Sequence, residues 1–257
     1  MVGPAWKSFV EEITLWRDSG RVVEFWWRDD DAGRPDPALS RLLKLASLSK
    51  VPLGLAAIPE TSQRAIFEGI NSDVAVIQHG VDHVNRSAPS EKKTEFPFSE
   101  PVDQALQRLV GGRKRLESLA GNLLIPVLVP PWNRLSPALT PLLGGAGYLG
   151  LSTFGVRKVT NPAPGVIAFN THVDIIDWKG TRGFCGVDHA LGQAVRHLES
   201  GRRVRADARE PTGWLTHHAM HDERCWTFLE ELFDVTSSIE GVLWRSPADL
   251  FAGRHAA

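Results

Sequence analysis

The strongest constraint on the fold is a regular alternation of short apolar runs with amphipathic segments along the 257 residues. The runs have strand length and many β-branched and aromatic residues, whereas the amphipathic segments show helical spacing. Strands are predicted at 22–28, 51–58, 73–78, 124–129, 148–153, 166–173, 213–216 and 242–244. Helices are predicted at 4–17, 61–70, 102–119, 136–143, 187–198 and 248–251, and after the capping residues Asp36 and Asp222. This alternation predicts an α/β fold, with a parallel sheet wrapped by helices.

The number of strand–helix units favours a closed or nearly closed barrel over an open sheet. A single α/β barrel takes about 250 residues. No linker rich in Ser, Gly or Pro divides the chain, so residues 1–257 are predicted to form one domain. The turn after the first predicted strand, residues 29–33, is acidic rather than glycine-rich, which disfavours a dinucleotide site.

Composition narrows the function classes. The formal net charge of −1 gives no reason to expect a nucleic-acid partner. No apolar run approaches the roughly 20 residues of a membrane span. The two cysteines form neither a metal-binding pair nor a disulfide framework. Residues 1–20 are acidic and lack a long apolar core, so we expect no secretory signal, a cytoplasmic location and free thiols.

Acidic residues and histidines gather at the ends of predicted strands. The first strand leads into the aspartates 29–31, the third into His79 and His83, and the seventh into His217 and His218. Barrel enzymes build their active sites at the carboxyl ends of their strands, so these side chains are expected to converge. Such a set indicates a metal-assisted hydrolytic centre.

Each group also has a simpler interpretation. The three aspartates could form a turn and a helix cap, but adjacent carboxylates repel one another and require a cation, either a metal ion or Arg28. Arg28 lies two residues before Asp30 and therefore on the same face of the strand. His79 and His83 could be surface residues, but their spacing is typical of histidine pairs that bind zinc.

Five motifs in order, spread over about residues 22–222, resemble those of the polysaccharide deacetylases, carbohydrate esterase family four. The resemblance implies a distorted seven-stranded β/α barrel and metal-dependent deacetylation. By the first motif Asp30 would be the general base and Asp31 a metal ligand, with Asp29 and Asp30 as the alternative pairing. By the second, His79 and His83 would complete a metal triad, and Gly80 stands where the family has a hydroxyl residue.

The third motif resembles Val129-Pro130-Pro131-Trp132, without the arginine that the family places before the prolines. Arg28 or Arg134 would then supply the guanidinium, and the backbone N–H of Trp132 would stabilise the oxyanion. Both arginines and Asn133 are also expected to contact substrate.

The fourth motif resembles Asp174-Ile175-Ile176-Asp177-Trp178, in which Asp177 would orient the catalytic histidine and Trp178 would wall the groove. The fifth resembles Leu215-Thr216-His217, with His217 as the general acid. His218 replaces the family's acidic residue and is assigned to substrate binding, and either imidazole could face the substrate.

The resemblance implies that a divalent ion, zinc being our first choice, polarises the acetyl carbonyl while Asp30 deprotonates the attacking water. His217 then protonates the departing amine. Cobalt, nickel, manganese and iron also suit an Asp-His-His set.

The expected substrate is a cytoplasmic N-acetylated precursor of a surface polysaccharide such as the lipopolysaccharide O-antigen. Lys92 and Lys93 in the loop 90–97 would meet its phosphate or uronate, unless this loop is simply solvated. One alternative is a hydrolase of a non-sugar amide or cyclic imide, similar to allantoinases. Another is a sugar-binding barrel without catalysis, which the missing arginine favours. The oligomeric state is left open.

The nine tryptophans divide between these predictions. Trp132 and Trp178 are expected to line the cleft, since flat apolar faces suit a sugar ring. Trp26, Trp27 and Trp214 are expected to pack beneath it.

Overall fold

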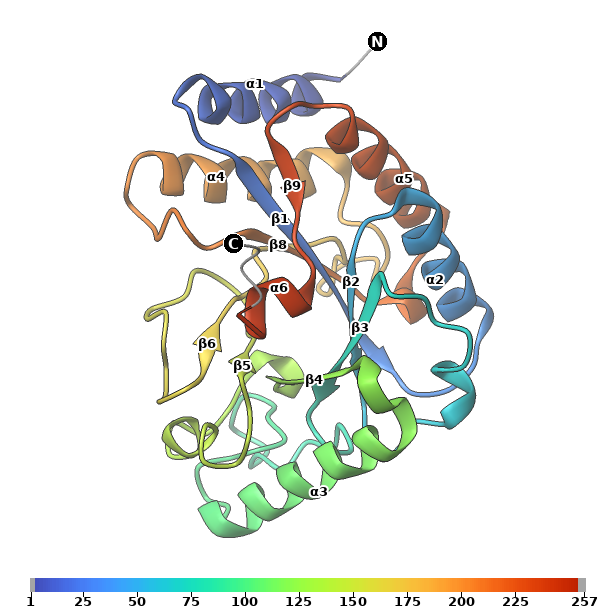
Figure 1. Ribbon diagram of the computed structural model, residues 1–257, viewed down its shortest axis with the longest axis vertical. Helices are drawn as coiled ribbons and strands as arrows, with labels where there is room; N and C mark the ends of the chain where they lie inside the picture. Colours follow the sequence, from blue (N-terminus) through green and yellow to red (C-terminus); the bar gives the residue numbers. More distant parts are fainter. Residues whose placement is uncertain (1–2, 254–257) are drawn as a thin grey trace.

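The computed structural model describes residues 3–253, and its central feature is a curled parallel sheet (Figure 1). The strands run in the order β6-β5-β4-β3-β2-β1-β8-β7, and β9 pairs with the first residues of β1. They are β1 (Val23–Ala32), β2 (Leu53–Ala57), β3 (Val74–His79), β4 (Leu124–Val129), β5 (Gly150–Leu151), β6 (Ile167–Ala168), β7 (Val173–Asp174), β8 (Thr212–Thr216) and β9 (Val242–Trp244).

The two edges of the sheet almost meet. Past the end of β5, Phe154 forms an isolated parallel bridge with Thr171, which precedes β7. The N–H of Gly155 donates to the carbonyl of Thr171 at 2.7 Å, and the N–H of Thr171 donates to Thr153 at 3.0 Å. The prediction of a distorted, nearly closed α/β barrel is therefore confirmed.

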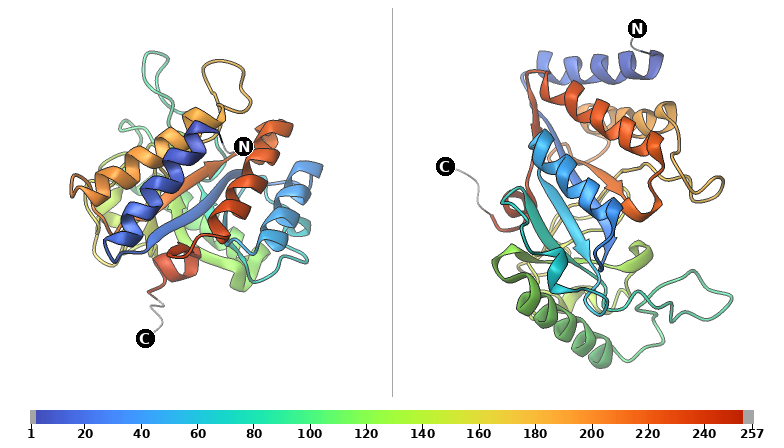
Figure 2. Two further views of the ribbon diagram at one scale, coloured as in Figure 1. Left: turned by 90° about the horizontal axis from the view of Figure 1, so that it is seen from above. Right: turned by 90° about the vertical axis from the view of Figure 1, so that its right-hand side faces the viewer.

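Helices cover the outside of the sheet (Figures 1 and 2). They are α1 (Pro4–Asp18), α2 (Pro37–Ser49), α3 (Val102–Ala120), α4 (Val187–Arg202) and α5 (Glu223–Ser237). The short helix α6 (Pro247–Phe251) lies instead against the inner face, where Leu250 and Phe251 pack with Trp26 and Val127. Asp36 and Asp222 cap α2 and α5 as predicted, because their carboxylates accept backbone N–H groups at 2.8 and 3.0 Å. Among residues 3–253, no helix is both long enough and apolar enough to span a membrane.

The strand β1 runs through the core. It pairs with β2, β8 and β9, and apolar side chains on both of its faces are buried, as expected for a parallel strand covered on two sides. Trp26, Trp27 and Trp214 are completely buried, as predicted. Trp26 packs inside the barrel with Phe251, whereas Trp27 and Trp214 pack on the outer face against Phe233 and Phe228 of α5, so the prediction that these two lie beneath the site is wrong. The indole N–H of Trp26 donates to the carbonyl of Asn170, and that of Trp27 donates to the Thr216 hydroxyl, both at 2.9 Å.

Three predicted elements are wrong. The helices at 61–70 and 136–143 are single 3-10 turns, Arg64–Ile66 and Thr140–Leu142, because such short segments gain few hydrogen bonds for the entropy lost in helix nucleation. The run 166–173 is two strands, because its start pairs with β5 and its end pairs with β8. Local periodicity does not show this change of neighbour.

Two long loops project from the same side of the molecule (Figure 2). One follows β3 and the other follows β7, so both rise from the carboxyl ends of strands. They flank the region in which the predicted site residues lie.

Candidate metal centre

Three predicted metal ligands meet at the carboxyl edge of the sheet. Asp31 lies near the end of β1, His79 ends β3, and His83 lies on the loop that follows. The Nε2 atoms of His79 and His83 lie 3.1 and 3.4 Å from Oδ1 of Asp31. The parallel order β3-β2-β1 brings the ends of β1 and β3 to the same edge of the sheet with one strand between them, so the convergence follows from the topology.

The hydrogen bonds around Asp31, His79 and His83 leave their ligand atoms free to bind a cation. Nδ1 of His79 donates to the carbonyl of Val129 at 3.0 Å, and since a carbonyl only accepts, Nδ1 carries the proton in the neutral ring. The lone pair of His79 Nε2 therefore faces Asp31. Oδ1 of Asp31 is buried and accepts no hydrogen bond within residues 3–253. Two imidazole nitrogens and one carboxylate oxygen thus fit a divalent ion.

Electrostatics point the same way. Burial raises the pKa of Asp31, but the neighbouring His79 and the charge of His217 outweigh it and lower this pKa well below its usual value. Burial lowers the pKa of His79, but the charges of Asp30 and Asp31 raise it overall. The site therefore favours positive charge.

The backbone around the centre is unusual. Asp31, His83, Trp132 and Asn133 have φ values of 73°, 58°, 54° and 56°. Asp, Asn and His tolerate this left-handed region better than most residues, whereas a bulky residue such as Trp rarely adopts it, at a cost of about 1–2 kcal/mol. Strained backbone of this kind clusters at functional sites.

A guanidinium lies beside Asp30, and it belongs to Arg28. Nε of Arg28 is 2.9 Å from Oδ1 of Asp30, and its Nη2 donates to Oδ2 at 3.1 Å and to the side chain of Asn133 at 2.9 Å. Arg134 is exposed and donates instead to the carbonyl of Lys93. Of the two alternatives for the missing arginine, the geometry selects Arg28.

These contacts correct part of the substrate-binding prediction. Arg28 is completely buried and also donates to the Ser152 hydroxyl at 2.7 Å, so it orients Asp30 and Asn133 rather than contacting a substrate. Asn133 is half-buried and already bonded to Arg28. The pairing of Asp30 with Asp31 fits better than that of Asp29 with Asp30, since Asp31 is the residue that meets the histidines.

The prediction that His218 binds substrate is wrong, because its ring is buried between two aspartates. Nδ1 of His218 pairs with Oδ1 of Asp29 at 2.5 Å, and its Nε2 lies 3.5 Å from Oδ2 of Asp36. Burial lowers the pKa of His218, but the charge and hydrogen bond of Asp29 and the charge of Asp36 raise it to about 8. His218 thus ties the end of β8 to β1 and to the start of α2, and it leaves His217 as the imidazole nearer the centre.

The residue that supports His217 also differs from the prediction. The carboxylate of Asp177 accepts the N–H groups of Gly180 and Thr181 at 3.0 and 3.1 Å, so it caps a turn. The indole N–H of Trp178 donates to Oδ2 of Asp174 at 2.8 Å, and the indole ring packs edge-on against the His217 ring at 4.7 Å.

Asp174, and not Asp177, is therefore the acid near His217. Burial raises the pKa of Asp174, and the charge of His217 partly offsets this rise. The position of Asp174 at the end of β7 was a usable signal, because strand ends mark the site.

The two tryptophans predicted to line the cleft lie beside different histidines. The Trp132 ring is 4.4 Å from that of His83, and Trp178, with 41% of its surface exposed, contacts His217. Both carry flat apolar faces next to the proposed chemistry.

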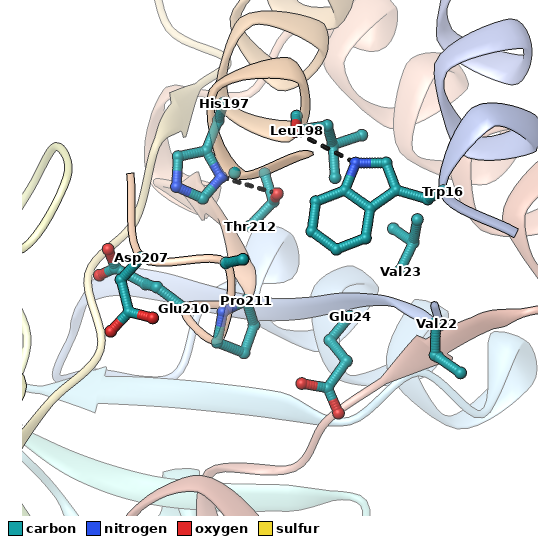
Figure 3. A pocket seen from close by; sticks show the side chains of 12 residues that line it. Trp16, Val22, Val23, Glu24, His197, Leu198, Asp207, Glu210, Pro211 and Thr212 are labelled. Atoms are coloured by element: carbon teal, nitrogen blue, oxygen red, sulfur yellow. Dashed lines mark hydrogen bonds between the residues drawn. The ribbon is translucent and has the colours of Figure 1, made fainter. Parts of the chain in front are cut away.

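A second cluster of donors lies at the other end of the barrel, by the pocket between α1, α4 and the starts of β1 and β8 (Figure 3). It consists of His172, His197 and Glu210. Nδ1 of His172 accepts the N–H of Gly213 at 3.0 Å, so in the neutral ring the proton is on Nε2, which faces Glu210 at 3.5 Å. This proton occupies the position that a metal would need, so the cluster is a structural network rather than a metal site.

No family model and no curated protein sequence matches the chain. Its structure is similar to that of a protein described as a polysaccharide deacetylase from Mycobacterium smegmatis, with a TM-score of 0.65, 15% identity, and coverage of 91% of this chain and 90% of that one. A cobalt complex of a family 4 acetyl xylan esterase from Clostridium thermocellum has a TM-score of 0.54 and 12% identity, with 89% of this chain and 90% of that chain covered. For a peptidoglycan deacetylase from Bacillus subtilis the TM-score is 0.54 and the identity 14%, with 90% of each chain covered.

The chain has the polysaccharide deacetylase fold. The fold implied by the sequence resemblance is thus confirmed over about nine-tenths of the chain. The roles of Asp30, Asp31 and His217 remain predictions.

Proposed function

We propose that this protein is a metal-dependent hydrolase that removes the acetyl group from an N-acetylated sugar. The observation that carries the proposal is the convergence of Asp31, His79 and His83 beside the Arg28–Asp30 pair. The deacetylase fold supports it.

The residues divide the chemistry between them. A divalent ion held by Asp31, His79 and His83 would polarise the acyl carbonyl and lower the pKa of water. Asp30, oriented by Arg28, accepts the proton of the attacking water. The backbone N–H of Trp132 stabilises the developing oxyanion, and His217 protonates the amine as the C–N bond breaks.

Zinc is the metal we propose, because two imidazoles and one carboxylate with open positions form a common catalytic zinc set. Cobalt is the ion named for the clostridial esterase of similar fold, and it is the useful spectroscopic substitute.

For the substrate we propose a cytoplasmic precursor of a surface polysaccharide, such as that of the O-antigen. Trp132 and Trp178 provide flat faces for the sugar ring. Lys92 and Lys93 are exposed on the loop that follows β3 and are suited to a phosphate or uronate of that precursor.

Single substitutions test the assignment through acetate release and metal content. Asp30→Asn should keep the metal and lose activity, whereas His79→Ala should lose both. His217→Ala should slow turnover with little change in metal content. Full activity in Asp30→Asn would refute the proposal.

A substrate panel separates the alternatives. Turnover of allantoin or small imides in place of N-acetyl sugars would indicate an amide hydrolase, and a metal-free protein that binds sugar would indicate a non-catalytic barrel. The missing arginine favoured the non-catalytic barrel. It no longer does so, because Arg28 pairs with Asp30.

A further inference from the structure

The loop between β3 and α3 contains a carboxylate that is completely buried. Glu95 is 0% exposed, although its neighbours Lys92 and Lys93 are exposed. Its two oxygens accept the backbone N–H groups of Val81 at 3.0 Å, Asp82 at 3.3 Å and His83 at 3.2 Å. One side chain thus binds three consecutive peptide groups that end at a proposed metal ligand.

An arginine from α3 balances the buried charge. Nη1 of Arg108 donates to Oε1 of Glu95 at 3.2 Å, and Nη2 donates to its carbonyl at 3.3 Å. Arg108 also binds both carboxylate oxygens of Glu100 at 3.0 Å. Glu95 is therefore anchored to the first turns of α3 as well as to the loop.

The same carboxylate explains why Gly80 departs from the family pattern. Gly80 has φ of +54°, and a Cβ there would overlap Oε2 of Glu95 and would lie 2.6 Å from Cδ of Pro131. A serine or threonine would not fit beside this carboxylate. Glycine and the buried glutamate are thus two parts of one arrangement.

The two histidines differ in how they are held. His79 is fixed by its strand and by the bond from its ring to Val129. His83 lies on the loop in a left-handed conformation, and its N–H bonds to Glu95. We propose that Glu95 is a positioning residue whose carboxylate holds residues 81–83 so that His83 faces Asp31 and His79. This inference rests on the proposed metal centre.

Cobalt binding to the full-length protein tests it. Metal-free wild type, Glu95→Gln and Glu100→Gln are titrated with Co²⁺, with the visible absorption and the dissociation constant as readouts. The glutamine places an NH₂ group against backbone N–H donors, so Glu95→Gln should weaken Co²⁺ binding by about 10- to 100-fold and alter the spectrum, as changes to groups that orient metal ligands do. Glu100→Gln removes the other carboxylate on Arg108 and should bind Co²⁺ like wild type.

The outcomes separate the two proposals. If wild type does not bind Co²⁺, the metal centre itself is wrong. If wild type binds and folded Glu95→Gln has the same affinity and spectrum, the positioning role is wrong. Should Glu95→Gln fail to fold, Glu95→Asp decides, because it keeps the charge but withdraws the carboxylate. If Glu95→Asp binds Co²⁺ more weakly than wild type, the positioning role of Glu95 is supported. If it binds Co²⁺ as tightly as wild type, that role is wrong.

Discussion

The buried pair of Asp29 and His218 should make the stability of the folded protein depend on pH. His218 lies between Asp29 and Asp36, and Asp29 is completely buried. We therefore expect His218→Gln to lower the free energy of unfolding, and to lower it most at a pH at which His218 of the wild type is protonated. A buried carboxylate that loses its partner typically costs about 3–5 kcal/mol.

The sign and size of the pH effect follow from the pKa of His218, which is about 8 in the folded state against an ordinary value of 6.5. Because the folded value is the higher one, the contribution is fully present below pH 6.5 and is lost as the pH rises through 8. At about 1.4 kcal/mol for each pH unit between the two values, the contribution is about 2 kcal/mol.

Urea denaturation from pH 6 to pH 9 measures this effect, in chelator so that metal binding does not contribute. The gap in unfolding free energy between wild type and His218→Gln should narrow by about 2 kcal/mol over this range. The variant His189→Gln, at an exposed position on α4, is the control. A gap that is constant or widens with pH would refute the reasoning.

Other contacts give three shorter predictions. Asp174→Asn should lower kcat by about tenfold while Asp177→Asn changes it by less than about twofold, measured by acetate release, and equal effects would return the orienting role to Asp177. Gly80→Ala should lower the free energy of unfolding by more than about 1 kcal/mol in urea, whereas Gly111→Ala, in open space on α3, should not; equal values would argue against the overlap at Gly80. Zn²⁺ at 100 times its Kd should stabilise chelator-treated protein by about 2.7 kcal/mol in the same assay, and a similar gain in His79→Ala would place the ion elsewhere.

Much of the fold was predictable because the long elements carry their own periodicity. The bounds predicted for β4 and β9 match those of the structure, and α1 differs by one residue. Between residues 136 and 176 the predicted strand 148–153 contains β5, but the bounds of the strands and the division of 166–173 were not predictable, because these strands are two residues long and are defined by their neighbours.

Within the site, the meeting of Asp31, His79 and His83 was predictable because strand direction alone brings them to one edge. The support around them was predictable only in part. Arg28 lies beside Asp30 because of the two-residue period of the strand, and Asp174 lies at a strand end. The contacts of Glu95 depend on where a long side chain points and on which distant backbone it reaches, and these leave no local pattern.

The sequence by itself determined an α/β barrel and the acids and histidines at its rim, because periods of two and 3.6 residues and the order of strand ends are local properties. Only the tertiary structure decided that His218 is buried, that Arg28 rather than Arg134 pairs with Asp30, and that Glu95 holds the loop of His83. Each of these is a contact between segments far apart in the chain or between groups of opposite charge removed from water. Its strength depends on packing that no single segment encodes.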